Sequence, residues 1–214
     1  MVALVFRGVA FAHDDAHPLF QDVTLRLCPG VHGVTGENGS GKTTLLRLVS
    51  GALAPDRGAV RVEPPGAVVA LCPQTVDVLG EDVWAFAERR DARALALGRA
   101  LDLRPGMLDR WETLSPGERR RWQLAAALHA EPDVLLCDEP RNHLDRDARD
   151  RTARALAGFR GVALVVSHDR GFLDAVCAGT LRVHNGKVEV YTLPYSRARA
   201  AWEAEARARE GERA

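Results

Sequence analysis

The stretch that begins at Gly36 combines residue types that together can hold a chain of phosphates. It reads Gly-Glu-Asn-Gly-Ser-Gly-Lys-Thr. Glycines let the backbone curl tightly enough for successive N–H groups to point at one phosphate. A lysine after them reaches the terminal phosphates of a nucleoside triphosphate, and a threonine hydroxyl ligates Mg²⁺. The residues predicted to bind the nucleotide here are Gly36, Asn38, Gly39, Ser40, Gly41, Lys42, Thr43 and Thr44.

The residues on either side distinguish this loop from a glycine-rich turn that carries a stray lysine. An apolar string, residues 31–35, precedes it, and residues 44–50 have a helical period that stops at Gly51. A strand, a glycine loop and a helix in this order favour the phosphate loop, and the positive helix end adds to its attraction for anions. ATP and Mg²⁺ are therefore the predicted cofactors.

Two carboxylates follow an apolar run, residues 134–137, that is typical of a central parallel strand. Acidic residues often terminate strands, so taken alone the pair could equally be a polar strand end. Beside a phosphate loop, Asp138 is predicted to hold Mg²⁺ through water, and Glu139 to orient or deprotonate the attacking water.

The elements that must position these residues alternate between buried strands and helices. This order predicts an α/β domain of the P-loop NTPase type, with a mostly parallel sheet and an N-terminal antiparallel β region. An Ala-, Arg- and Leu-rich region predicts an inserted helical subdomain at about 77–125, with a break at Pro105-Gly106. A helix is predicted from Ser115 to about Ala130, and the charged tail, 193–214, reads as an exposed helix or a frayed extension. The other predicted elements are strands at 2–12, 19–27, 59–62, 67–73, 162–166, 180–184 and 187–192, and a helix at 146–158.

Composition excludes some classes of function. Among 214 residues, 29 Lys and Arg balance 29 Asp and Glu, so no net charge draws the chain to nucleic acid or anionic lipid. No apolar run approaches the ~18 residues of a membrane span, and the first residues do not form a signal peptide. The chain is predicted to be soluble and cytoplasmic, without direct membrane insertion. Its widely spaced cysteines predict small buried thiols rather than disulfides or zinc ligands; they are Cys28, Cys72, Cys137 and Cys177.

Further motifs, taken in order, resemble the ATP-binding cassette (ABC) ATPase domain over about residues 1–192. Leu114-Ser-Pro-Gly-Glu118 resembles the signature motif, and its Ser115 lies 23 residues before Asp138. Gln74 in Cys-Pro-Gln resembles the Q-loop. Asn142-His-Leu-Asp145 resembles the D-loop, and His168 in Ser-His-Asp resembles the switch histidine.

The resemblance implies a site shared between two domains. Ser115 and Gly117 would face the γ-phosphate bound by a second ABC domain, so that two nucleotides are sandwiched head to tail. The chain departs from the family at Pro116, where glycine is usual, and this proline removes one N–H donor. From the sequence itself, Ser115, Pro116 and Glu118 predict a capped helix start.

The remaining roles also follow from the resemblance. His168 would bond the γ-phosphate and hold Glu139 in place, and Gln74 would touch Mg²⁺ or the attacking water. His13 would stack on adenine, with Phe11 on the same face of the strand. A structural histidine and a surface glutamine are the plainer alternatives. Arg119-Arg-Arg-Trp122 is predicted to be a solvated helix face rather than a nucleic-acid patch.

Two longer segments, residues 139–145 and 167–174, resemble the corresponding sequences of the ABC-F branch, with Arg141 where threonine is usual. That branch is soluble and acts on ribosomes, which makes the ribosome a candidate partner. It normally carries two cassettes, so this chain is a fragment or forms a homodimer. The alternatives are an ATPase subunit that docks on a transmembrane permease through residues 77–125, and a non-hydrolysing, ATP-dependent interaction module, which only Pro116 favours.

Overall fold

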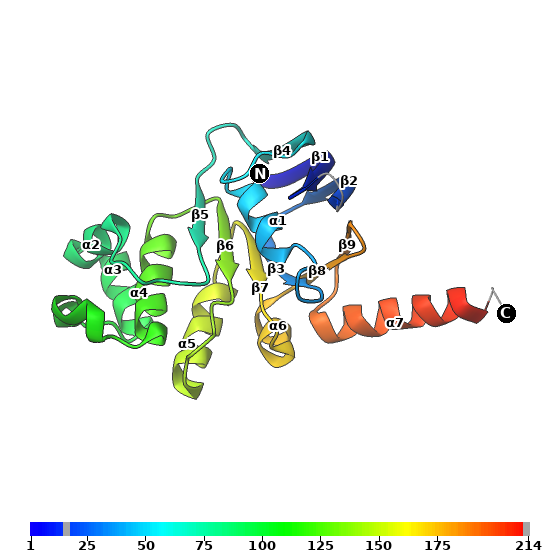
Figure 1. The fold of residues 1–214 in the computed structure, drawn as a ribbon. Helices are drawn as coiled ribbons and strands as arrows, with labels where there is room; N and C mark the ends of the chain where they lie inside the picture. Colours follow the sequence, from blue (N-terminus) through cyan, green and yellow to red (C-terminus); the bar gives the residue numbers. More distant parts are fainter. Residues whose placement is uncertain (15–17, 212–214) are drawn as a thin grey trace.

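The computed structural model describes residues 1–14 and 18–211, which form a layered α/β fold (Figure 1). A six-stranded sheet has the order β5-β6-β7-β3-β8-β9, and a three-stranded antiparallel sheet has the order β2-β1-β4. In the larger sheet only β9 runs antiparallel to its neighbour. The predicted fold class is confirmed. The strands are β1 (Ala3–Ala12), β2 (Pro18–Leu27), β3 (Gly30–Thr35), β4 (Arg57–Glu63), β5 (Val69–Cys72), β6 (Val134–Asp138), β7 (Val162–Val166), β8 (Gly179–His184) and β9 (Lys187–Tyr191).

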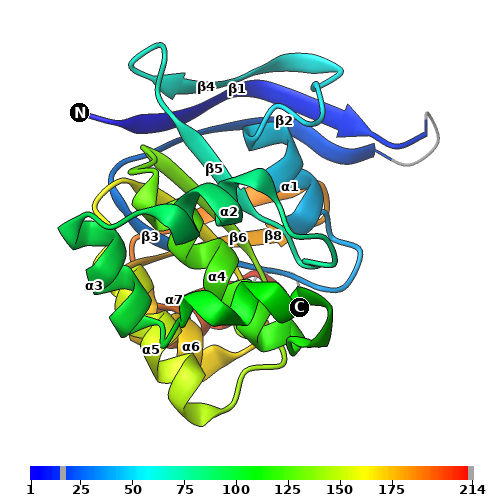
Figure 2. The same ribbon diagram turned by 90° about the vertical axis from the view of Figure 1, so that its left-hand side faces the viewer.

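The helices group by position. Figure 1 shows α2, α3 and α4 together on one side of the molecule, and Figure 2 shows the antiparallel sheet lying above α1. After α3 the chain leaves the helix near Leu101, and a 3-10 helix begins at Pro105, where the predicted break was placed. Proline is tolerated there because a first-turn residue needs no N–H donor. The helices are α1 (Lys42–Val49), α2 (Glu81–Glu88), α3 (Ala92–Ala100), the 3-10 helix η1 (Pro105–Thr113), α4 (Pro116–His129), α5 (Arg146–Ala157), α6 (Arg170–Val176) and α7 (Tyr195–Gly211).

The central strands bury both of their faces, which explains their unbroken apolar runs. Val134 and Leu136 of β6 pack in one core with α1 and the antiparallel sheet. Leu135 and Cys137, which point the other way, pack in a second core with the helical region and Trp122. Because strand side chains alternate between faces, β6 is held from both sides and its carboxyl end is fixed in position.

The arginines of α4 were predicted to form a solvated helix face, and this prediction is wrong. Arg119 donates to the carbonyls of Trp111 and Glu112 at 3.1 and 2.8 Å. Arg121 donates to the carbonyl of Leu101 at 2.6 Å, and Arg120 is buried. These carbonyls lie at the ends of η1 and α3, where helices leave carbonyl groups without helical partners. The arginines therefore join the pieces of the helical region.

The cysteines are free thiols, and three of them, Cys72, Cys137 and Cys177, are buried as predicted. The prediction is wrong for Cys28, which is exposed. Cys28 lies in the short connection between the ends of β2 and β3, outside both cores.

The first turns of α7 pack on the domain. Tyr195 and Ala198 are buried, and the Ser196 N–H donates to Asp174 Oδ1 at 2.8 Å. Trp202 makes edge-on ring contacts with Tyr195 and Tyr191, at centroid distances of 6.0 and 5.5 Å. Residues 203–209 are exposed, and this part of the helix projects from the molecule (Figure 1). The predicted boundary at residue 192 stays a prediction, since packing continues past it.

Among residues 1–14 and 18–211, no helix has the length and apolar character needed to cross a bilayer.

We expect two truncations of α7 to differ in stability. Ending the chain at Leu193 removes the buried Tyr195, Ala198 and Trp202 contacts and should lower the free energy of unfolding by about 3 kcal/mol. Ending it at Glu203 removes residues 204–214, of which 204–209 are exposed, and should change it by less than about 0.5 kcal/mol. Urea unfolding of both proteins checks this, and equal losses would contradict the packing described.

Candidate active site

The glycine loop joins β3 to α1 at the carboxyl edge of the large sheet. Gly41 has φ 104°, and a Cβ there would lie 2.9 Å from Phe20 Cζ, so no other residue fits. Asn38 and Gly39 form an exposed turn, and Ser40 Oγ is buried without a hydrogen-bond partner within the described residues. The first turn of α1 has no side-chain cap. Free N–H groups at a helix start suit an anion.

Lys42 folds back over this loop. Its Nζ donates to the carbonyls of Gly36 and Glu37 at 2.9 and 2.8 Å. Burial lowers the pKa of Lys42, and the charges of Glu139 and Asp138 oppose that shift. Lys42 therefore lies within electrostatic reach of both carboxylates.

Thr43 and Asp138 meet across the sheet. Thr43 Oγ1 donates to Asp138 Oδ2 at 2.8 Å, although 95 residues separate them. β6 and β3 flank β7, so the parallel strands end at one edge and bring Asp138 to the glycine loop. A hydroxyl and a carboxylate are oxygen ligands of the kind that Mg²⁺ takes together with waters and phosphates. The pair therefore fits a magnesium ion.

Glu139 is the buried carboxylate of the site. Its side chain is 7 % exposed, its φ is 51°, and its N–H donates to the Val166 carbonyl at 2.9 Å. Oε1 has no hydrogen-bond partner within the described residues and lies 3.6 Å from His168 Nε2. Burial raises the pKa of Glu139; the charge of His168 opposes this shift and that of Asp138 adds to it. A carboxylate with a raised pKa is a better base.

His168 comes from the loop after β7, next to Glu139. Its side chain is 61 % exposed, so it reaches the site from the surface. Ser167, one residue earlier, is buried and accepts the Asp169 N–H at 3.2 Å. The structure thus brings together Lys42, Thr43, Asp138, Glu139 and His168.

Two further predicted residues border this cluster. Gln74 is exposed and leaves the sheet beside Asp138, because Cys72 of β5 pairs with Cys137 of β6. His13 Nε2 lies 3.3 Å from Thr44 Oγ1, at the start of α1. The His13 ring also makes an edge-on contact with Phe11 at 5.0 Å.

Ser115 and Gly117 lie at the start of α4, outside the cluster. Ser115 Oγ accepts the Glu118 N–H at 3.2 Å, and Glu118 Oε2 accepts the Ser115 N–H at 2.8 Å, which confirms the capping box. A Cβ at Gly117 would lie 2.7 Å from the His143 carbonyl oxygen, so α4 packs closely on the loop before α5. Ser115, Gly117 and Asp145 line a cleft of about 260 Å³.

Arg120 is a residue that the sequence analysis missed. Its buried guanidinium donates to the backbone carbonyls of Glu139 and Gln74. Burial lowers the pKa of Arg120, while the charges of Glu139 and Asp138 raise it. Helical spacing could have predicted that Arg120 is buried, because it shares a helix face with the apolar Leu124, four residues further along.

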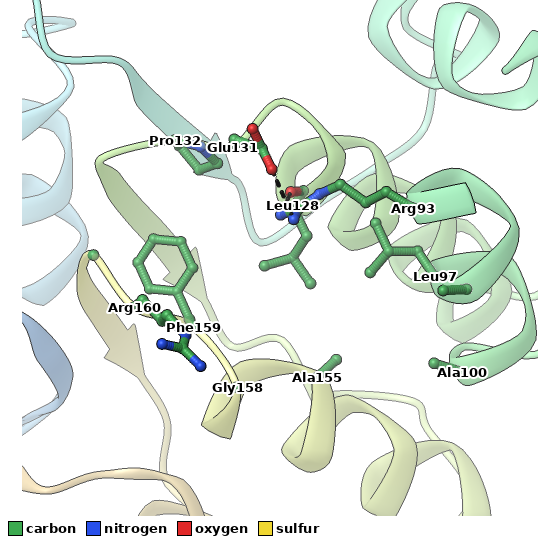
Figure 3. Close-up of a pocket in the computed structure, with 12 residues that line it drawn as sticks. Arg93, Leu97, Ala100, Leu128, Glu131, Pro132, Ala155, Gly158, Phe159 and Arg160 are labelled. Atoms are coloured by element: carbon green, nitrogen blue, oxygen red, sulfur yellow. Dashed lines mark hydrogen bonds and ion pairs between the residues drawn. The ribbon is translucent and has the colours of Figure 1, made fainter. Parts of the chain in front are cut away.

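A cavity of about 520 Å³ lies at the opposite edge of the sheet, where β6 and β7 begin. Figure 3 shows α3 on one side of it and Phe159 on the other. Arg93 Nη1 pairs there with Glu131 at 2.8 Å, and Arg93 Nη2 donates to the Leu128 carbonyl at 2.7 Å. None of the predicted site residues lines it.

Comparison with known families agrees with this geometry. Residues 20–142 match the family described as "ABC transporter". The chain belongs to the ATP-binding cassette family, and it is an ATPase domain that binds nucleotide.

Two solved structures share the fold. A bacterial Atm1-family ABC exporter with ATP bound aligns with a TM-score of 0.72 and 20 % identity, over 88 % of this chain and 38 % of the exporter chain. An ATP-binding subunit of an ABC transporter aligns with a TM-score of 0.69 and 23 % identity, over 89 % and 90 % of the two chains. At such identities the likeness shows the fold alone.

The sequence relatives are more similar, and they are ABC-F proteins, which confirms the resemblance to that branch. ATP-binding protein Uup of Caulobacter vibrioides is 40 % identical over 81 % of this chain and 29 % of its own length. Tylosin resistance ATP-binding protein TlrC of Streptomyces fradiae is 34 % identical over 97 % of this chain and 47 % of its own length. Energy-dependent translational throttle protein EttA of Mycobacterium tuberculosis is 32 % identical over 89 % of this chain and 42 % of its own length. The chain spans less than half the length of each of these relatives.

We expect Arg120→Met to lower both stability and turnover. The methionine keeps an apolar stem but leaves two backbone carbonyls without their charged donor, which should lower the free energy of unfolding by about 2 kcal/mol. Turnover should fall about 10-fold, because the backbone of Glu139 loses its support from α4. Urea unfolding and phosphate release measure the two effects. Arg47→Met, on an exposed arginine of α1, is the control, and an equal effect of both variants would contradict the role of Arg120.

Glu139→Gln should stabilise the nucleotide-free protein at neutral pH. The folded-state pKa of Glu139 is raised, so above that pKa the buried charge destabilises the fold, and glutamine removes this cost. The gain should shrink as the pH falls through the folded-state pKa and vanish below about 4.5, the ordinary pKa of a glutamate. Thermal unfolding from pH 4 to 8 measures it, and a gain that grows toward low pH would contradict the raised pKa.

Proposed function

We propose that this chain is the ATP-hydrolysing cassette of an ABC-F-like protein, which binds Mg-ATP and works as a head-to-tail pair with a second cassette. The observation that carries the proposal is the contact between Thr43 and Asp138, with Lys42 and Glu139 beside it. These residues supply the phosphate contact, the metal ligands and the base that phosphoryl transfer to water requires.

The glycine loop and Lys42 hold the phosphates, and His13 contacts the adenine. Thr43, Asp138 and Gln74 would hold a magnesium ion, whose charge stabilises the phosphates when it is bound. Glu139 takes the proton from the attacking water, which its raised pKa favours. The His168 imidazole donates to the γ-phosphate, and its position near Glu139 Oε1 supports this role.

A second domain completes the site. Ser115 and Gly117 line a cleft of their own with Asp145, apart from the glycine loop of the same chain. This arrangement supports a site in which the start of α4 faces the nucleotide of the other cassette. Pro116 has no N–H group, so α4 has one donor fewer for the phosphate of that nucleotide. Ser115 and Gly117 would therefore make the contact with it. The second cassette is either another copy of this chain or a further part of a longer polypeptide.

The ribosome is the partner we favour, and the cytoplasm the location. EttA, which is 32 % identical, carries the name "translational throttle", and its match covers 89 % of this chain. The alternative partner is a transmembrane permease docked on the helical region. The likeness to an exporter, at 20 % identity, shows the fold alone and gives this alternative no support.

A single variant, Glu139→Gln, tests both the catalytic role and the partner. Without its base, turnover should fall at least about 100-fold, while ATP binding persists and the paired cassettes stay closed. The trapped protein should co-sediment with ribosomes in ATP, and Lys42→Ala, which cannot hold the phosphates, should not.

Two outcomes would contradict it. Turnover of Glu139→Gln equal to that of the parent would remove the catalytic assignment. Co-purification of the trapped protein with a permease, and not with ribosomes, would replace the ABC-F role by the transporter role.

A further inference from the structure

Two separate loops carry the residues assigned to the attack of water. The Glu139 loop (residues 139–145) follows β6, and the His168 loop (residues 167–169) follows β7. The side chain of His168 is 61 % exposed, so surrounding side chains do little to fix its ring. Its distance to Glu139 therefore depends on how the two loops are held together.

A cleft of about 310 Å³ opens between these loops. Glu139, Arg141, His168 and Asp169 are among its lining residues. Because the loops are not packed against each other at this cleft, specific bonds must set their separation. One is the backbone bond from the Glu139 N–H to the Val166 carbonyl, at the base of the loops.

The second bond is an ion pair between Arg141 Nη1 and Asp169 Oδ2. The arginine side chain is 13 % exposed and the aspartate 39 %, so the pair is partly removed from water and less screened than a surface pair. Burial and the charge of Arg149 lower the pKa of Arg141, and the charge of Glu139 opposes this. Arg141 thus lies close enough to Glu139 to feel its charge.

Both ends of the ion pair are fixed to their own loops. Asp169 uses its other oxygen, Oδ1, to accept the Phe172 N–H at 2.7 Å and caps α6. Arg141 accepts the Leu144 N–H on its carbonyl at 3.2 Å, and the Asn142 N–H donates to the Glu139 carbonyl at 3.3 Å. A displacement of either loop would therefore strain the ion pair.

We propose that Arg141 is a positioning residue for ATP hydrolysis, whose ion pair with Asp169 holds the His168 loop at its working distance from Glu139. This inference rests on the roles proposed above for Glu139 and His168. A threonine at this position would lack the guanidinium and could not form the ion pair. The ion pair acts on the chemical step and leaves nucleotide binding to the glycine loop.

The test is a double-mutant cycle on the full chain. Asp169→Asn keeps the cap of α6, because asparagine caps helices as well as aspartate, and removes only the charge. Arg141→Met keeps the apolar stem. Each variant should lower kcat about 10-fold, since small misplacements of reacting groups cost up to about 100-fold. The KM for ATP and the affinity for a fluorescent ATP analogue should change less than about 2-fold.

Coupling and rescue separate this role from a general loss of structure. The double variant should be no slower than either single variant, because both remove the same interaction. Arg141→Lys should recover most of the lost kcat, and Arg199→Met, which removes an ion pair on α7, should match the parent.

Each other outcome overturns the inference. An unchanged kcat, a double variant as slow as the product of the single effects, or a fall in ATP affinity together with kcat would each do so. The proposed function has its own test in Glu139→Gln. If Glu139→Gln abolishes turnover while the Arg141 and Asp169 variants hydrolyse ATP normally, only the positioning role fails.

Discussion

The hydrogen bond between Thr43 and Asp138 is the interaction on which the site depends. It joins the glycine loop to a strand two positions away in the sheet, and it forms because parallel strands end at a common edge. Two apolar cores fix that edge by burying both faces of β6. Packing therefore sets the position of the polar groups at this edge.

Arginines connect the helical region to this edge. Arg120 reaches from α4 to the backbone of Glu139 and of Gln74, so one buried cation holds two loops of the site. Arg141 holds a third loop through Asp169. Arginine suits these positions because its planar group donates several hydrogen bonds in fixed directions. The loops at the catalytic edge are thus held by charged groups, whereas the apolar cores hold the strands that carry these loops.

Most of the fold and the glycine loop could be predicted from the sequence, because they depend on local patterns. The apolar runs of β6 and β7 and the Ser115 capping box each have a short-range signal. Helical spacing signals that Arg120 faces the core, but its partners could not be predicted, since they are backbone carbonyls 19 and 46 residues away, which have no sequence signature. Helix α6 was missed because it has only 7 residues. The exposure of Cys28 depends on where a turn leaves the core, which composition does not report.

The close approach of Gly117 to the His143 carbonyl has a consequence of its own. At this point the first turn of α4 lies close to the His143 carbonyl and the Leu144 side chain, and a Cβ at residue 117 would approach both to under 3 Å. A tilt of the helical region would thus be transmitted to residues 142–145 within one chain, before any second cassette arrives. The two surfaces on which pairing is proposed to depend would then move as a unit.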